Sequence, residues 1–149
     1  MGYKYGVWYV YQKGTFPTKH IGHFTVTCFM EKEEAKKLYT ELLEKFGSKN
    51  IVNVDSTNPV IFEKNIYKDD NNNICSWGYK GKILNWNGIQ KICDKYSCNF
   101  SLIPHSSIEY SYNENDINPI KKASGELIDL ELKLVDISSD DYLDWNIIG

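Results

Sequence analysis

Two segments of the sequence alternate between apolar and polar side chains with the two-residue period of a β-strand. The first covers residues 23–30 and places His23 and Thr25 on its polar face. Its apolar face is expected to carry Phe24, Val26, Cys28 and Met30. This pattern predicts a half-buried strand whose open face presents a histidine and a hydroxyl group.

The second alternating segment follows Pro104 and belongs to a strand predicted over residues 100–112. His105, Ser107 and Glu109 are expected on one face of this strand. The other face is expected to carry Ser106, Ile108, Tyr110 and Tyr112. Both segments therefore present a histidine, a hydroxyl residue two positions later, and an apolar residue directly after it.

The rest of the pattern predicts two helices and four further strands. Apolar residues at helical spacing predict a helix over residues 31–46, which Gly47 ends. A shorter helix is predicted over residues 86–96, with Asn85 as a candidate N-cap. The further strands are predicted at residues 6–11, 58–68, 73–81 and 126–137, with a hairpin loop at residues 69–73.

Length and charge set the class of protein. The chain has 149 residues and no low-complexity linker, which predicts a single α+β domain over residues 1–149. The formal net charge is −3, and no basic stripe of the kind that binds long nucleic acid is present. The first residues lack an apolar run of the length that a signal peptide or membrane span needs. We therefore expect a cytoplasmic protein with no membrane and no long nucleic acid among its partners, and the sequence indicates no oligomeric state.

The types of charged and metal-binding side chains limit how the chain can bind a phosphate or a metal ion. All basic residues are lysines, so a phosphate must be held by lysine, hydroxyl, histidine or backbone N–H groups. The four cysteines lack the two-residue spacing of a zinc site, and the chain has only three histidines. We therefore expect no metal site and no cofactor.

Two histidines on strands suit acid–base chemistry at a phosphodiester. A histidine and a hydroxyl two residues apart lie on one side of a strand, about 6.5 Å from each other along it. One imidazole can take a proton while the other gives one, because the free pKa of histidine, about 6.5, makes both forms accessible near neutrality. Such groups contribute roughly 10²–10⁴ in rate, and the hydroxyls can stabilise charge on the phosphoryl oxygens. His23 and His105 are the predicted pair, 82 positions apart, whereas His20 lies outside either motif and is interpreted as a loop residue.

The residues His23-Phe24-Thr25-Val26 and His105-Ser106-Ser107-Ile108 resemble the signature of the 2H phosphoesterase superfamily. That signature is a pair of His-x-Thr/Ser-hydrophobic motifs roughly eighty residues apart, and the resemblance spans nearly the whole chain. It implies two pseudo-symmetric lobes of antiparallel strands, with helices on the outside and a central cleft. It also implies that His23 and His105 are the acid–base pair, and that Thr25 and Ser107 hold the phosphate.

The superfamily suggests several substrates. Members open 2′,3′-cyclic phosphates on RNA ends, cut 2′-5′ oligoadenylates, or cut the cyclic oligonucleotides of bacterial immune signalling. Residues 119–145 are loosely similar to the tails of the phage enzymes of this last group. The prediction is therefore a metal-independent phosphodiesterase for short or cyclic oligonucleotides, acting in the host cytoplasm if it is viral. The alternatives are a 2′,3′-cyclic phosphodiesterase of RNA-end or tRNA processing, and a nucleotide-binding module without catalysis.

Further side chains are candidates for substrate contact. The aromatic candidates are Tyr9 and Tyr11 on the first strand and Trp77, although core packing is the simpler interpretation of each. Trp86 is a further aromatic that can stack on a base. The acidic candidates are Glu109, beside the second motif, and Glu131 on the last long strand.

Overall fold

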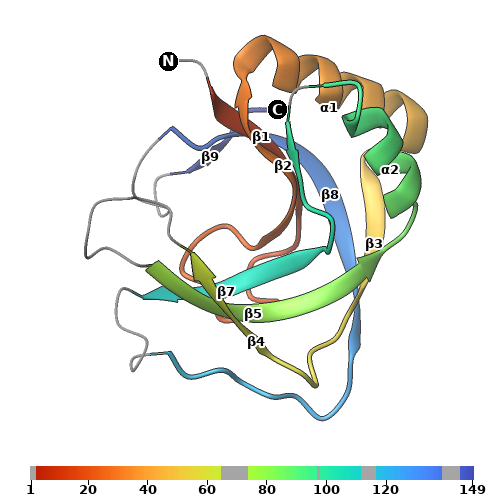
Figure 1. The fold of residues 1–149 in the computed structure, drawn as a ribbon. Coiled ribbons are helices and arrows are strands. Elements are labelled where there is room, and N and C mark those ends of the chain that lie inside the picture. The colour runs from red at the N-terminus through yellow and green to blue at the C-terminus, as the bar shows by residue number, and fades with distance from the viewer. Residues whose placement is uncertain (1–2, 65–73, 97, 112–116, 139–144) are drawn as a thin grey trace.

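The computed structural model describes residues 3–64, 74–96, 98–111, 117–138 and 145–149, and in these ranges an antiparallel sheet curls beside two helices (Figure 1). The helices are α1 (Lys32–Phe46) and α2 (Trp86–Cys93). The strands are β1 (Tyr3–Val10), β2 (His23–Glu31), β3 (Lys49–Val54), β4 (Val60–Lys64), β5 (Ile74–Ile83), β6 (Asn99–Phe100), β7 (His105–Ser111), β8 (Glu126–Asp136) and β9 (Asn146–Ile147). The predicted α+β class, with helices outside the strands, is confirmed. Within the described ranges, neither helix is long and apolar enough to cross a membrane.

The sheet has two wings, and each wing carries one of the two histidine motifs. Its strand order is β4-β5-β3-β8-β1-β2-β6, with β7 paired to β5 and β9 paired to β8. We call β4, β5 and β7 the small wing and the remaining strands the large wing; pairing of β3 with β5 joins them. His23 begins β2 in the large wing, and His105 begins β7 in the small wing. The curl nevertheless brings β7 into contact with β2.

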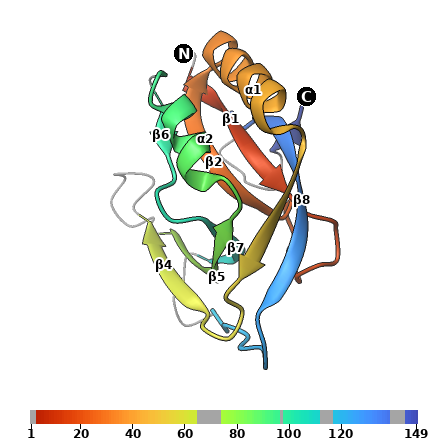
Figure 2. The ribbon, with the colours of Figure 1, turned by 90° about the vertical axis from the view of Figure 1, so that its right-hand side faces the viewer.

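The two helices pack on each other (Figure 2). The apolar stripe of α1 is buried against β1 and its neighbours and consists of Ala35, Leu38 and Leu42. Gly47 ends α1 with a positive φ of 77°, and its N–H donates to the carbonyl of Leu43. On α2, Gly88 lies so close to Phe46 that a side chain there would press on the ring. Lys95 and Tyr96, just after α2, both donate to the carboxylate of Glu41 on α1.

Several element boundaries differ from those predicted from the sequence. The strand predicted over residues 100–112 is divided into β6 and β7, because the chain turns at residues 101–104 before the carbonyl of Pro104 accepts a bond from Gly81. Asn85 does precede α2, but its backbone is left-handed with φ of 65° and its side chain makes no capping bond. The hairpin loop predicted at residues 69–73 lies outside the described residues, although β4 and β5 on either side do pair.

Two bulges reverse predicted strand faces. In β1 and β2, Trp8 pairs with Thr25 and Val7 with Thr27, so Val26 is an extra residue. Cys28 is therefore shifted off the face of Phe24 and packs in a small cluster around Trp8, which corrects its predicted face.

The second bulge lies between β5 and β7. Gly78 pairs with Ser107 and Trp77 pairs with Glu109, so Ile108 is the extra residue. Cross-strand partners share a face, so Glu109 leaves the face of Ser107 and the prediction that they share it is wrong. Tyr110 takes that place opposite Ser76 instead, while Tyr112 lies outside the described residues.

Candidate active site

The first motif histidine is held in one orientation. His23 begins β2, and its side chain is buried. Its Nδ1 lies 2.7 Å from the carbonyl oxygen of Ile21, two residues earlier. The indole of Trp8, from the neighbouring strand, stacks on the imidazole with 3.5 Å between ring centroids and 6° between planes. Ring position and ring plane are thus both determined by the fold.

The second motif histidine repeats this arrangement. His105 begins β7, and its Nδ1 lies 3.0 Å from the carbonyl oxygen of Ile103, again two residues earlier. Phe62 of β4 lies against its ring, with 4.7 Å between centroids. Lys80 of β5 is its cross-strand partner. Each motif therefore combines a backbone contact at Nδ1 with an aromatic ring beside the imidazole.

The shared contact assigns the proton-exchanging nitrogen. A carbonyl oxygen only accepts hydrogen bonds, so Nδ1 carries a proton in both His23 and His105. Nε2 is then the nitrogen of each ring that gains or loses a proton during chemistry. Among the described residues, no three His, Cys, Asp or Glu side chains are grouped closely enough to hold a metal ion.

A third histidine connects the two motifs. His20 is buried in the loop before β2, and its Nε2 donates to the carbonyl of Ser107 at 3.0 Å. Its ring lies 5.9 Å from that of His23 and 5.2 Å from that of Tyr110, edge to face in both cases. Burial lowers the pKa of His20, and the hydrogen bond to Ser107 partly opposes that shift. His20 does lie in a loop, as the sequence predicts, but its contacts with both motifs were not predicted because it belongs to neither.

The two predicted phosphate-holding hydroxyls lie on the faces of their histidines. Thr25 is half-buried and pairs across the sheet with Trp8, on the same face as His23. Ser107 pairs with Gly78 and is buried, with its Oγ 3.2 Å from the Oγ of Ser76. Ser76 was not predicted from the sequence, because only the pairing of β5 with β7 brings it to the motif.

The neighbouring serine has a different environment. Ser106 is fully buried, and its Oγ lies 2.8 Å from the hydroxyl of Tyr11. It pairs with Tyr79, a residue of the main core, so it faces away from Ser107. Of the two adjacent serines, only Ser107 lies on the histidine face.

The three aromatic residues predicted to contact substrate lie in the main core. Tyr9, Tyr11 and Trp77 are each at most 5% exposed and pack among apolar side chains. Burial raises the pKa of the Tyr11 phenol, and its hydrogen bond to Ser106 partly opposes the shift. These side chains support the strands that bear the motifs, and their burial keeps them from a substrate.

The two predicted acidic residues lie in different surroundings. Glu109 is exposed and lines a small cavity of about 170 Å³ beside His20. Glu131 of β8 pairs with Val10, which in turn pairs with His23, so it lies on the His23 face two strands away. Lys49 and Lys133 form ion pairs with Glu131, and the hydrogen bond from Lys49 is the main cause of its lowered pKa.

Comparison with known proteins adds no assignment. No protein-family model matches the sequence, and no curated protein matches it. The relation to the 2H phosphoesterases therefore stays a prediction from the two motifs.

Proposed function

We propose that this protein is a phosphodiesterase that hydrolyses short or cyclic oligonucleotides without a metal ion. The observation that carries the proposal is the matched geometry of His23 and His105, each fixed through Nδ1 by a carbonyl two residues earlier. A hydroxyl residue follows each of them on the same face, at Thr25 and Ser107. Two imidazoles and two hydroxyls are the groups that acid–base cleavage of a phosphodiester requires.

The proposed reaction uses the two Nε2 atoms in opposite roles. One imidazole takes a proton from the attacking hydroxyl, which is water or a ribose 2′-OH, as the new P–O bond forms. The other, protonated at the start, gives its proton to the leaving oxygen as the old P–O bond breaks. Attack by water yields a phosphomonoester and an alcohol, and attack by a 2′-OH yields a cyclic phosphate and an alcohol.

Lysines beside each motif supply positive charge for the phosphate. Lys80 is the cross-strand partner of His105. Lys133 pairs with Trp8, whose other partner is Thr25, so it lies on the face of the first motif. With no arginine in the chain, these ammonium groups and the two hydroxyls are the groups proposed to stabilise negative charge on the phosphoryl oxygens.

The test is digestion of a substrate panel in EDTA, followed by mass spectrometry. The panel contains 2′,3′-cyclic AMP, 2′-5′ oligoadenylate, and several cyclic di- and trinucleotides. We expect an oligonucleotide to be cut by the wild type, and His105→Ala to lower the rate about 10²–10⁴-fold. Leu102→Ala, at an exposed site outside the motifs, is the control that retains the wild-type rate.

Each other result has a defined meaning. Cleavage of 2′,3′-cyclic AMP alone would replace the proposal with RNA-end processing. Binding with recovery of intact ligand would replace it with a nucleotide-binding module. If the substrate is an oligonucleotide that serves as an immune signal, the enzyme is proposed to be viral. It would then act in the host cytoplasm.

A further inference from the structure

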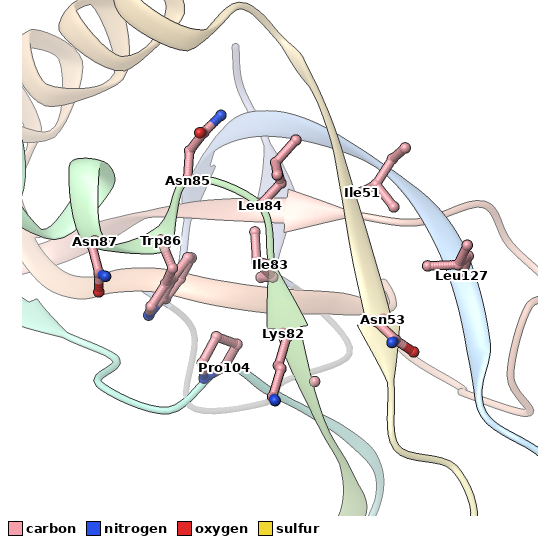
Figure 3. A pocket seen from close by; sticks show the side chains of 11 residues that line it. Ile51, Asn53, Lys82, Ile83, Leu84, Asn85, Trp86, Asn87, Pro104 and Leu127 are labelled. Carbon is pink, nitrogen blue, oxygen red and sulfur yellow. The ribbon is translucent and has the colours of Figure 1, made fainter.

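A cavity of about 740 Å³ lies where the end of β5 meets the start of α2 (Figure 3). Residues from β3, β5, α2, β8 and the segment before β7 line it. They are Ile51, Asn53, Gly81, Lys82, Ile83, Leu84, Asn85, Trp86, Asn87, Pro104 and Leu127. Its volume falls in the range of small-molecule sites, about 300–1,000 Å³. We call it the β5–α2 cavity.

One wall of the β5–α2 cavity is the indole ring of Trp86, which its neighbours hold in place. Trp86 stands beside Pro104 in Figure 3. Its indole N–H donates to the carbonyl of Ser101 at 3.1 Å, and its ring packs against Phe100 with 5.0 Å between centroids. A half-buried, hydrogen-bonded indole offers a rigid face for stacking, which every nucleobase can use.

The lining of the β5–α2 cavity is mostly apolar, and a few polar groups stand within it. Asn53 and Lys82 are cross-strand partners at one side of the β5–α2 cavity, and Asn85 and Asn87 lie near the start of α2. Lys82 is the one charged residue among those that line the cavity, and its charge is positive. The apolar part of the lining suits the faces of a base and its sugar, while the amides can read base edges and the single ammonium group can pair with a phosphate.

The β5–α2 cavity borders the second histidine motif in the chain. Pro104 lines it and is followed directly by His105. Lys80, the partner of His105, and Lys82 are two residues apart on one face of β5, about 6.5 Å along the strand. A ligand chain with phosphates at successive positions can therefore run from His105 along β5 into the cavity.

We propose that the β5–α2 cavity binds a second nucleotide of the substrate, with its base stacked on Trp86 and its phosphate beside Lys82. This subsite rests on the proposed phosphodiesterase function, and it predicts a preference for oligonucleotides over mononucleotides. A 2′,3′-cyclic mononucleotide at His105 leaves the cavity empty, whereas a cyclic dinucleotide reaches both places.

Binding to the His105→Ala protein measures the subsite without cleavage. Cyclic di-AMP and AMP serve as probes in titration calorimetry, with indole N–H signals followed by NMR. We expect Trp86→Leu to weaken cyclic di-AMP binding about 5- to 150-fold, which is the range of one base stack, and to leave AMP binding nearly unchanged. Lys82→Gln is the second variant, because it alters the exposed charge without touching the packing of Trp86. Leu102→Ala again serves as the control.

The outcomes separate this proposal from the proposed function. If wild-type protein cuts oligonucleotides and both cavity variants cut and bind them as well as the wild type, the subsite is refuted while the function stands. If nothing is cut but cyclic di-AMP still shifts the Trp86 signal and depends on Lys82, the subsite stands and the function fails. Failure of cyclic di-AMP to bind at all refutes the subsite. So does a wild-type dimer that Trp86→Leu dissociates, because the cavity would then be occupied by a second copy.

Discussion

Trp8 lies flat on the imidazole of His23, with ring centroids 3.5 Å apart and planes inclined by 6°. The contact joins two strands: Trp8 is on β1, and its partner across the sheet is Thr25 of the same motif. Trp145 packs against the indole at a tilt, with 5.8 Å between centroids. The histidine is therefore confined between an indole face and the backbone contact at Ile21, and it can present Nε2 in one direction only.

Replacement of Trp8 by leucine removes that confinement. We expect kcat to fall roughly 10- to 100-fold, because a misplacement of about 1 Å costs that much in an acid–base step. KM for the oligonucleotide that the wild type cuts should change little, since Trp8 orients the histidine and is not proposed to hold the phosphate. Steady-state kinetics in EDTA provide the measurement.

Trp8→Phe is the matched control because it keeps an aromatic face at the same place. It should recover most of the lost kcat while leaving a cavity of its own. Thermal unfolding must accompany both variants, because Trp8 is only 2% exposed and truncation also costs stability. Equal kcat values for wild type and Trp8→Leu would contradict the positioning role.

The adjacent serines provide a second prediction. Ser107 lies on the face of His105, so Ser107→Ala should lower kcat by about 10²-fold, as loss of one anion-stabilising donor does. Ser106 instead bonds Tyr11 in the core. Ser106→Ala should therefore leave kcat near wild type and reduce the free energy of unfolding by about 1–3 kcal/mol, since a buried phenol loses its partner. Urea unfolding with parallel kinetics measures both, and an exchange of the two phenotypes would overturn the assignment of faces.

His20 leads to a prediction about acid stability. Burial lowers its pKa in the folded state below the ordinary 6.5, so the unfolded chain binds more protons in the window just below that pH. Stability contributed by neutral His20 is thus present above about pH 6.5 and is lost as the pH falls through the folded-state pKa. The slope approaches about 1.4 kcal/mol per pH unit at most.

His20→Gln isolates the contribution of His20 protonation to the free energy of unfolding. Glutamine keeps an amide N–H that can donate to the carbonyl of Ser107 but does not titrate. We expect its free energy of unfolding to vary less with pH than that of the wild type below about pH 6.5. His23 and His105 are present in both proteins, so their contributions cancel in the difference. Parallel curves from urea titrations at several pH values would show that His20 is not buried in the neutral form.

Much of the fold was predictable because several elements carry a clear local period. The alternation in residues 23–30 and the apolar stripe of residues 31–46 correspond to β2 and α1 within one residue. β3 was not predicted, since its six residues are flanked by turns and its alternation is short. Yet β3 joins the two wings, which shows that the long-range pairing of a strand is not encoded in its local pattern.

The candidate site was predictable in its motifs and not in its surroundings. His23 and His105 each begin a strand, and the repeated His-x-Thr/Ser pattern identifies them as candidates because a two-residue period puts both motif residues on one face. Trp8 and Ser76 reach the motifs only through strand pairing, of β1 with β2 and of β5 with β7. The bulge that displaces Glu109 inserts one residue into β7, and a strict two-residue period cannot anticipate such an insertion.

Gly78 provides the last prediction, because it determines how closely β7 approaches β5. A Cβ at this position would overlap the carbonyl oxygen of Ser106 and lie 3.0 Å from the Cα of Ser107. Both are backbone atoms, so Gly78→Ala must push β7 away from β5 at the serine proposed to hold the phosphate. We expect a loss of about 1–3 kcal/mol or more in the free energy of unfolding, together with a fall in kcat.

Gly14→Ala is the control for this prediction. Gly14 has a φ of 91°, but no atom lies within 4 Å of the added carbon. Only backbone strain of about 1–2 kcal/mol is therefore expected, with kcat unchanged. Wild-type stability and kcat in Gly78→Ala would mean that the two strands are not in this register.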